Sequence, residues 1–255
     1  MAIVSQENIL SILTTFNPWW QNGVVPKAFV KEFHRSSYYT CRKSLLSDLR
    51  RIVVMSGARR TGKTTIMYQL IHDLLEQGVK PQNILFFTFD HPLIRMAGMD
   101  QVLNIYKNNI SDDAHFYMFV DEVQFDKDWT NYLKMAYDMN PDMRSVATGS
   151  ASAAIEDDVR ESGAGRWTVI KVTTLSFYEY CALKGISKAQ SVDDVFRIHT
   201  LSKQQQTQLM MGLSDLQIHL MRYMQIGGFP ELVKTEDVPY AQKLIREDVM
   251  DRAIK

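Results

Sequence analysis

The sequence of 255 residues is poor in cysteine and contains no long apolar run. Its two cysteines, Cys41 and Cys181, lie far apart and outside any CxxC pattern, which argues against a disulfide framework or a zinc site. No stretch of 18 apolar residues is present, and no basic segment followed by a short apolar one begins the chain. We therefore expect a soluble, cytoplasmic protein with no membrane partner.

The sequence also lacks an overall excess of charge, because 29 Lys and Arg face 29 Asp and Glu. The balance is nevertheless uneven along the chain. Residues 1–80 carry 11 basic and 5 acidic side chains, whereas residues 81–255 carry 18 and 24. A basic first third suits a phosphate site and also permits contact with nucleic acid, although most such side chains in proteins are simply solvated.

Short apolar runs alternate with helical patterns through the middle of the chain. The runs that read as buried strands are 51–55, 83–89, 115–120, 144–150 and 166–175, and the helical patterns between them are 64–77, 100–109 and 128–139. Strands that alternate with helices indicate a parallel sheet with crossover connections. The sequence therefore predicts a three-layer αβα sandwich of the α/β class.

The flanking segments differ from this α/β core, which we place at residues 46–175. Residues 1–45 are expected to form an N-terminal helical extension, in which the tryptophans of "NPWW" (17–20) serve as packing anchors. Residues 176–255 show no strand signal and are predicted to form a smaller helical lid subdomain. The last helical pattern reaches Lys255 without a capping glycine, so we expect the natural protein to continue into a further domain.

The stretch from Gly57 to Thr64 gives the strongest functional signal, because it fits the phosphate-binding pattern G-x-x-x-x-G-K-[ST]. It lies between a buried strand and an amphipathic helix, as such a loop must. Backbone N–H groups of this loop can surround a β-phosphate, and the helix directs its positive end at the anion. Lys63 supplies a mobile cation and Thr64 a hydroxyl for Mg²⁺. We expect nucleotide contacts from Gly57, Ala58, Arg59, Arg60, Thr61, Gly62, Lys63, Thr64 and Thr65.

A second half of the site is predicted at "HFYMFVDE" (115–122), an apolar strand that ends in two carboxylates. Asp121 is placed to hold Mg²⁺ together with Thr64, and Glu122 to activate a water against the γ-phosphate. The sequence has neither the NKxD motif of GTPases nor the LSGGQ motif of ABC-type ATPases. Nucleotide kinases share the loop but usually lack a water-activating glutamate after the aspartate. These features favour ATP hydrolysis, with Lys63 and Glu122 as catalytic residues.

Five motifs occur here in one order: "GARRTGKTT", "FVDEVQFDKDWTNYLKMAYD", "VATGSAS", "GRWTVIKVTTLSFYEY" and "YMQIGGFPELV". Together, over residues 50–235, they resemble the bacterial and archaeal AAA+ ATPases of the AAA_14 type. Full-length members of that family usually carry a C-terminal DUF4143 domain, which this chain does not reach. The resemblance thus implies a P-loop ATPase module with an attached C-terminal domain.

The same resemblance assigns roles that the residue chemistry leaves open. It places Thr148 and Ser150 at the sensor-1 position, where a hydroxyl contacts the γ-phosphate or the attacking water. It also makes Arg166, in preference to Arg160, a candidate finger for the nucleotide of a neighbouring subunit in a homo-oligomer. An ordinary turn and a surface arginine are the alternatives at these two places.

The resulting expectation is a Mg²⁺-dependent ATPase that binds ATP and ADP and couples hydrolysis to conformational change in an attached domain or partner. Two alternatives stay open. One is a nucleotide-operated regulatory switch with negligible turnover, whose sequence would look almost the same. The other is a DNA-associated ATPase, which the basic first 80 residues permit only weakly.

Overall fold

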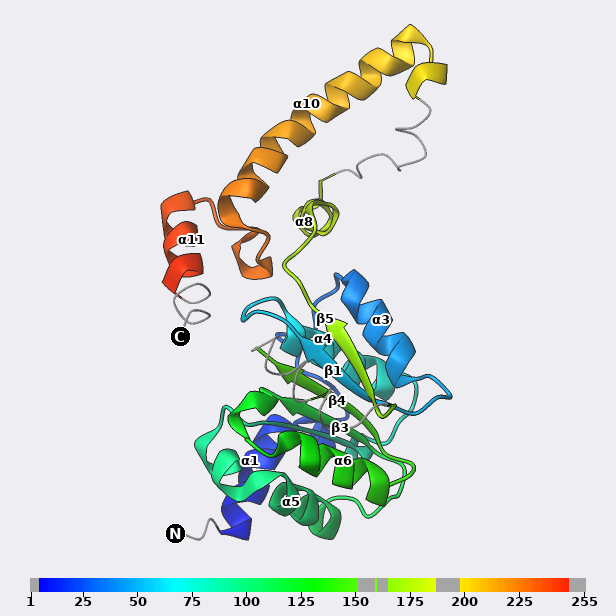
Figure 1. The fold of residues 1–255 in the computed structure, drawn as a ribbon, viewed down its shortest axis with the longest axis vertical. Helices are drawn as coiled ribbons and strands as arrows, with labels where there is room; N and C mark the ends of the chain where they lie inside the picture. The colour runs from blue at the N-terminus through cyan, green and yellow to red at the C-terminus, as the bar shows by residue number, and fades with distance from the viewer. Residues whose placement is uncertain (1–4, 151–158, 160–164, 187–197, 248–255) are drawn as a thin grey trace. The chain divides into compact units, whose positions relative to one another are not determined.

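Figure 1 shows the computed structural model of the protein, which describes residues 5–150, 159, 165–186 and 198–247. The chain divides into two compact units. The first consists of Met1–Ala58 and Gly62–Val172, and the second of Arg59–Thr61 and Thr173–Lys255. Among the residues that the structure describes, no helix combines the length and hydrophobicity needed to span a membrane.

The first unit contains a five-stranded parallel sheet in the order β2-β3-β4-β1-β5. The strands are β1 (Ile52–Ser56), β2 (Ile84–Thr88), β3 (Tyr117–Asp121), β4 (Arg144–Gly149) and β5 (Trp167–Lys171). The first four are buried over nearly their whole length, as strands covered on both faces must be, whereas β5 at one edge is partly exposed. The predicted parallel α/β domain is confirmed.

Helices cover both faces of this sheet. Their bounds are α1 (Gln6–Phe16), α2 (Trp19–Asn22), α3 (Ser36–Leu45), α4 (Lys63–Glu76), α5 (Pro92–Asn109) and α6 (Trp129–Met139). The crossover from β1 to β2 runs across the sheet in the opposite direction to the crossovers that lead to β3 and β4. Right-handed connections therefore place α4 on one face and α5 and α6 on the other. Helix α3 packs beside α4, and α1 beside α5 (Figure 1).

Helix α5 begins earlier than the sequence predicted, at Pro92 rather than residue 100. Its first turn is capped by the His91 side chain, which accepts a hydrogen bond from the N–H of Leu93. Gly98 has φ 75° and ψ 167° and interrupts the helix. The apolar periodicity is clear only beyond this break, which explains why the sequence pattern revealed the second part alone.

The "NPWW" turn closes the outer edge of β2. The Asn17 side chain, which is fully buried, donates to the Phe86 carbonyl (2.8 Å) and accepts from the Phe86 N–H (2.6 Å), as a neighbouring strand would. The indole N–H groups of Trp19 and Trp20 both donate to the Ile84 carbonyl, at 3.0 and 2.8 Å. Because an unpaired strand edge is a template for aggregation, these side chains protect the sheet as well as anchor the helices.

The second unit contains helices and no strand among its described residues. They are α8 (Phe177–Lys184), the 3₁₀ turn η3 (Ile198–Thr200), α10 (Lys203–Ile226), the 3₁₀ turn η4 (Pro230–Leu232) and α11 (Val238–Ile245). Its small core holds Leu175, Tyr180, Cys181, Ile226, Phe229, Leu232, Val233 and Ala241.

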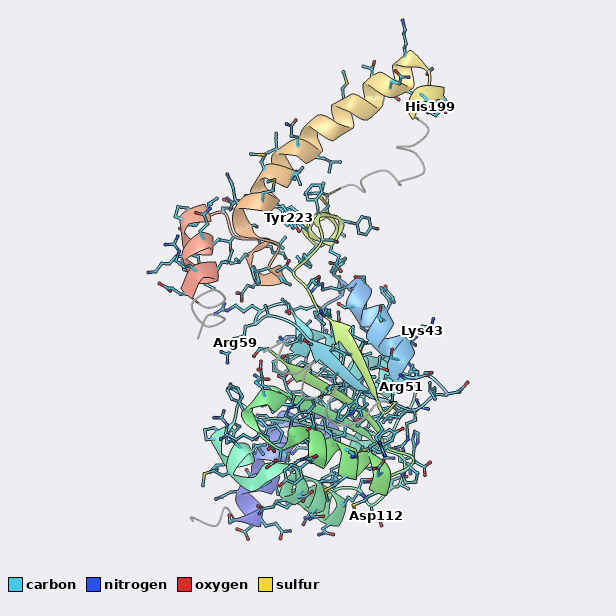
Figure 2. All side chains as sticks on the ribbon, in the orientation of Figure 1. Lys43, Arg51, Arg59, Asp112, His199 and Tyr223 are labelled. Atoms are coloured by element: carbon cyan, nitrogen blue, oxygen red, sulfur yellow. The ribbon has the colours of Figure 1, made fainter. Side chains whose placement is uncertain are left out.

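The "GGFPE" segment forms a tight turn inside this unit. Gly228 has φ 61°, and its carbonyl accepts a hydrogen bond from the N–H of Leu175 at 2.7 Å. The hydroxyl of Tyr223, labelled in Figure 2, donates to the Leu175 carbonyl at 2.7 Å. A Cβ at position 228 would lie 2.8 Å from both the Leu175 oxygen and the Tyr223 ring, so only glycine fits there.

Candidate functional site

The loop that follows β1 connects directly to α4. Gly62 caps that helix in a left-handed conformation (φ 92°), which a residue with a Cβ adopts only with strain. Lys63 is buried, and its amine donates to the carbonyls of Gly57 and Ala58, both at 2.8 Å. The loop therefore curves around the Lys63 amine and supplies the polar partners that a buried cation requires.

The other predicted loop residues have varied surroundings. Thr61 is buried, whereas Thr65 is half-buried. Arg59, which is labelled in Figure 2, is also half-buried. Residues 59–61 group with the second unit, in which Arg60 forms an exposed ion pair with Glu231. Exposed pairs of this kind contribute little to stability. This pair joins residues 59–61 to the "GGFPE" turn.

Asp121, the last residue of β3, meets the loop helix. The Thr64 hydroxyl donates to Asp121 Oδ2 at 3.0 Å, although the two residues are 57 positions apart. Asp121 is buried, and burial raises the pKa of its carboxyl, while hydrogen bonds from Thr148 and Thr64 oppose part of that rise. A buried carboxylate beside a hydroxyl, with the Glu122 carboxylate next in sequence, is a set of oxygen ligands suited to a divalent cation.

The order of the strands brings the end of β4 to the same place. Because β4 lies between β1 and β3, its last residue lies between the carboxyl ends of these two strands. The Thr148 hydroxyl donates to Asp121 Oδ1 and accepts a hydrogen bond from the backbone N–H of Glu122 at 3.2 Å. Thr148 thus contacts both predicted acids, whereas Ser150 contacts only one of the two, through the Glu122 side chain at 3.2 Å.

Glu122 adopts an unusual backbone conformation. Its φ of 54° and ψ of 47° are left-handed, and Arg60 is the other non-glycine residue with positive φ among those described. Such a conformation costs about 1–2 kcal/mol for a residue with a Cβ and is concentrated at functional sites. It redirects the chain into the 3₁₀ turn η2 (Val123–Phe125).

Gln124 in that turn was not predicted as a site residue. Its amide nitrogen donates to Glu122 Oε2 and to Ser150 Oγ, the latter at 2.9 Å. The sequence contains this glutamine within "FVDEVQ". Here the left-handed turn at Glu122 leads into the turn that carries Gln124, and the sequence pattern did not indicate the contact between the two side chains.

Arg166 lies away from this group. It immediately precedes β5, and its carbonyl accepts from the N–H of Ile52, the first residue of β1. In a parallel sheet the amino ends of all strands lie at the same end of the sheet. Arg166 therefore lies at the end opposite the loop that follows β1. Its guanidinium pairs with Asp138 at 3.1 Å. A contact with a neighbouring subunit stays a prediction, and Arg160 lies outside the described residues.

Basic side chains of the first 80 residues contact protein groups at several places. The Arg50 guanidinium stacks 3.5 Å from the centre of the Tyr137 ring and donates to the carbonyls of Tyr137 and Asn140. Arg42 pairs with Asp73 at 3.2 Å. These contacts account for part of the basic excess without a nucleic-acid partner, and DNA binding stays a prediction.

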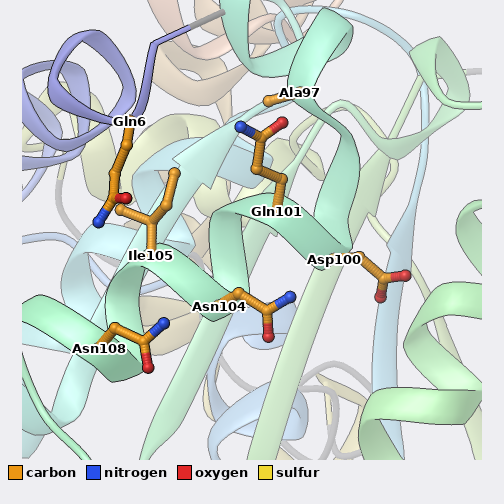
Figure 3. A pocket seen from close by; sticks show the side chains of 7 residues that line it. All are labelled: Gln6, Ala97, Asp100, Gln101, Asn104, Ile105 and Asn108. Carbon is orange, nitrogen blue, oxygen red and sulfur yellow. The ribbon is translucent and has the colours of Figure 1, made fainter.

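A groove lined by residues of α1 and α5 contains none of the predicted site residues. Figure 3 shows its lining, which is rich in side-chain amides. It has a volume of about 410 Å³ and is lined by Gln6, Ala97, Asp100, Gln101, Asn104, Ile105 and Asn108. These polar groups come from α1 and α5, and nothing among them indicates a particular ligand.

Comparison with known proteins gives distant relatives. An uncharacterized protein of Haemophilus influenzae is 28% identical over 193 residues, covering 73% of this chain and 41% of the relative. The uncharacterized protein MJ1544 of Methanocaldococcus jannaschii is 22% identical over 197 residues, covering 77% and 40%. The chain thus spans about two fifths of the length of these curated relatives.

Solved structures with a loose likeness include the S. cerevisiae Hsp104-ADP complex, with 16% identity and a TM-score of 0.43. That match covers 71% of this chain and 26% of the other chain. The Aeropyrum pernix ORC1 protein in complex with DNA is 12% identical, with a TM-score of 0.46 and coverages of 66% and 51%. At these scores nothing about function follows from the likeness.

The decisive match is to a protein family. The model of the AAA domain family AAA_14 matches residues 49–181, which is more than half of the chain. The matched segment contains the loop from Gly57 to Thr64, both carboxylates and the end of β4. The chain therefore belongs to the AAA_14 family of AAA domains.

Proposed function

We propose that this chain binds ATP together with Mg²⁺, hydrolyses it, and couples the reaction to conformational change in an attached domain or partner. One observation carries the proposal. Thr64 from the phosphate loop and Asp121 from β3 meet at 3.0 Å, and Thr148 links Asp121 to the backbone of Glu122. Three segments distant in sequence thus provide a cation site and a candidate base beside one loop.

The residues present fit a magnesium–nucleotide complex. Among the described residues, no group of three or more His, Cys, Asp or Glu could hold a metal ion. Mg²⁺ bound with a nucleotide does not need such a cage, because one or two carboxylates and the substrate phosphates suffice. Thr64 and Asp121 supply the hard oxygen ligands that this ion prefers. When bound, Mg²⁺ would neutralise charge on the phosphate oxygens.

The side chains and backbone of the protein then bind the phosphates and accept the proton of the attacking water. The Lys63 amine, now held by the carbonyls of Gly57 and Ala58, exchanges these neutral partners for phosphate oxygens, which are charged and therefore bind it more strongly. The loop N–H groups surround the phosphates. Glu122 accepts a proton from the attacking water, and Thr148 links the Asp121 carboxylate to the backbone N–H of Glu122.

Coupling to the helical unit is supported by the division of the chain. Residues 59–61 lie inside the phosphate loop in sequence, yet they group with the second unit, where Arg60 pairs with Glu231 of the "GGFPE" turn. A phosphate group that attracts Arg60 competes with Glu231 for the guanidinium. Nucleotide occupancy would thereby alter a contact within the helical unit, which is the coupling that we propose.

The test is phosphate release from Mg-ATP by the chain and by Glu122→Gln, with nucleotide affinity measured for both. We expect turnover to fall about 10²–10⁴-fold in the variant while affinity persists, because only proton transfer is removed. Glu76→Gln, the same change at an exposed end of α4, is the matched control and should retain full turnover.

Three other outcomes have distinct meanings. Binding without turnover by the unaltered chain would favour a nucleotide-operated switch over hydrolysis. Equal turnover in Glu122→Gln and the unaltered chain would remove Glu122 from the mechanism. Absence of ATP binding by the unaltered chain, with Lys63→Ala no different, would overturn the nucleotide site altogether.

A further inference from the structure

Both the nitrogen and the oxygen of the Gln124 side-chain amide form hydrogen bonds at the candidate site. Its nitrogen donates to Glu122 Oε2 and to Ser150 Oγ, and its oxygen accepts from the backbone N–H of Ser150 at 3.3 Å. The Ser150 hydroxyl in turn donates to the same oxygen of Glu122. Gln124, Ser150 and Glu122 thus form a closed network, which we call the Glu122 clamp.

Chemistry determines the orientation of the Gln124 amide within the clamp. The backbone N–H of Ser150 can only donate, so the group facing it must be the amide oxygen. The nitrogen is then directed to the Glu122 carboxylate, which accepts hydrogen bonds. A flipped amide would set donor against donor at Ser150 and oxygen against oxygen at Glu122.

The clamp occupies only one of the two carboxylate oxygens. Both donors reach Oε2 of Glu122, and Oε1 makes no hydrogen bond to the described residues. A carboxylate held at one oxygen has a restricted orientation while the other oxygen can still accept a proton. Such restriction matters because proton transfer requires a base held within hydrogen-bond reach of the water.

We propose that Gln124 is a positioning residue for Glu122: the Gln124 amide, together with Ser150 at the end of β4, holds Oε2 so that Oε1 serves as the general base. This role rests on the proposed hydrolysis of ATP. The strained backbone at Glu122 belongs to the same device, because the left-handed turn there is what returns Gln124 onto the preceding carboxylate.

The experiment is a double-mutant cycle in single-turnover ATP hydrolysis. Gln124→Met keeps the length of the side chain and removes both polar ends. Gln124→Glu keeps an oxygen for the Ser150 N–H and replaces the donor to Glu122 with a like charge. We expect both variants to lower the rate constant about 10–100-fold, within the range available to general base catalysis, with ATP affinity unchanged.

The diagnostic result is the combination with Glu122→Gln. If Gln124 acts through Glu122, adding Gln124→Met to the Glu122→Gln variant should lower the rate constant less than about twofold. The reason is that mutational effects at residues that act as a unit are not additive. A purely structural role would instead multiply the two losses and lower stability. Gln101→Met, a change of the same type on α5, is the control and should leave turnover unchanged.

Each remaining outcome is decisive. Turnover by the unaltered chain with no loss in either Gln124 variant would overturn the positioning role and leave hydrolysis standing. Faster turnover in Gln124→Met would mean that the clamp restrains Glu122 instead, and would also overturn the proposal. Absence of turnover by the unaltered chain, despite ATP binding, would overturn hydrolysis and the positioning role together.

Discussion

Replacing Asn17 with alanine removes the side chain that closes the edge of β2. Asn17 donates to the carbonyls of Leu13 (2.7 Å) and Phe86 (2.8 Å) and accepts from the N–H of Phe86 (2.6 Å). Both residues at this contact are buried, with Asn17 at 0% and Phe86 at 2% exposure. The variant leaves the two backbone groups of Phe86 without these partners in a place that water cannot easily reach.

The expected loss follows from that count. An unsatisfied buried polar group costs about 1–3 kcal/mol, so two of them give about 2–6 kcal/mol. The Leu13 carbonyl keeps its hydrogen bond from the Asn17 backbone N–H, so it adds little. We expect Asn17→Ala to reduce the free energy of unfolding by about 3–5 kcal/mol, a large part of the stability of a typical domain.

Tryptophan fluorescence during urea unfolding measures this loss in the first unit alone. All four tryptophans, Trp19, Trp20, Trp129 and Trp167, lie in that unit. With a urea m-value of about 1–3 kcal/mol per molar, the transition midpoint should fall by about 1–5 M at unchanged m.

Asn22→Ala is the control, because Asn22 is exposed and its side chain accepts one hydrogen bond, from the N–H of Val24 at 3.0 Å. It should cost less than about 1 kcal/mol. If Asn17→Ala were no more destabilising than Asn22→Ala, the edge-closing role of the Asn17 side chain would be refuted.

Two further changes test the site and the helical unit. Thr148→Val removes the hydroxyl that binds Asp121 and should reduce ATP turnover about 10–100-fold, while Thr148→Ser retains most of it; equal losses in phosphate-release assays would contradict this role. Gly228→Ala should destabilise the second unit about 1–3 kcal/mol more than Gly227→Ala. A Cβ at 228 lies 2.8 Å from the Leu175 carbonyl, whereas at 227 the nearest atom is a side-chain carbon at 3.4 Å. Thermal unfolding followed by circular dichroism would show the difference, and equal midpoints would count against it.

Local features of the fold were predictable because they depend on neighbouring residues. The apolar run 51–55 became β1 (Ile52–Ser56), and the helix expected at 64–77 became α4 (Lys63–Glu76). Spacing within eight residues predicted a loop and a helix start at Gly57 to Thr64, since backbone torsions there are set by the glycines and the residues beside them, and the phosphate-binding role of this loop stays a prediction. Where the apolar periodicity was weak, as before Gly98 in α5, the sequence pattern did not predict the helix.

Contacts between distant segments could not be predicted in the same way. The Asn17 amide acts as a strand neighbour for Phe86, 69 residues away, and this pairing has no signature in either segment. The place of Arg166 within the chain was likewise decided by tertiary contacts, because it precedes β5 and pairs with Asp138. Its role as a finger for the nucleotide of a neighbouring subunit stays a prediction.

By itself, the sequence determined the element types, the loop from Gly57 to Thr64 that leads into a helix, and the presence of Asp121 and Glu122 after an apolar strand, because each follows from local periodicity and spacing. Only the tertiary structure decided that β4 lies between β1 and β3, and that Thr148 therefore links the Asp121 carboxylate to the backbone N–H of Glu122. It also decided that Gln124 returns onto Glu122 through a left-handed turn. The physical reason is that strand order and side-chain contacts depend on the packing of the whole sheet, whereas helices, strands and loops are largely specified by the residues within them.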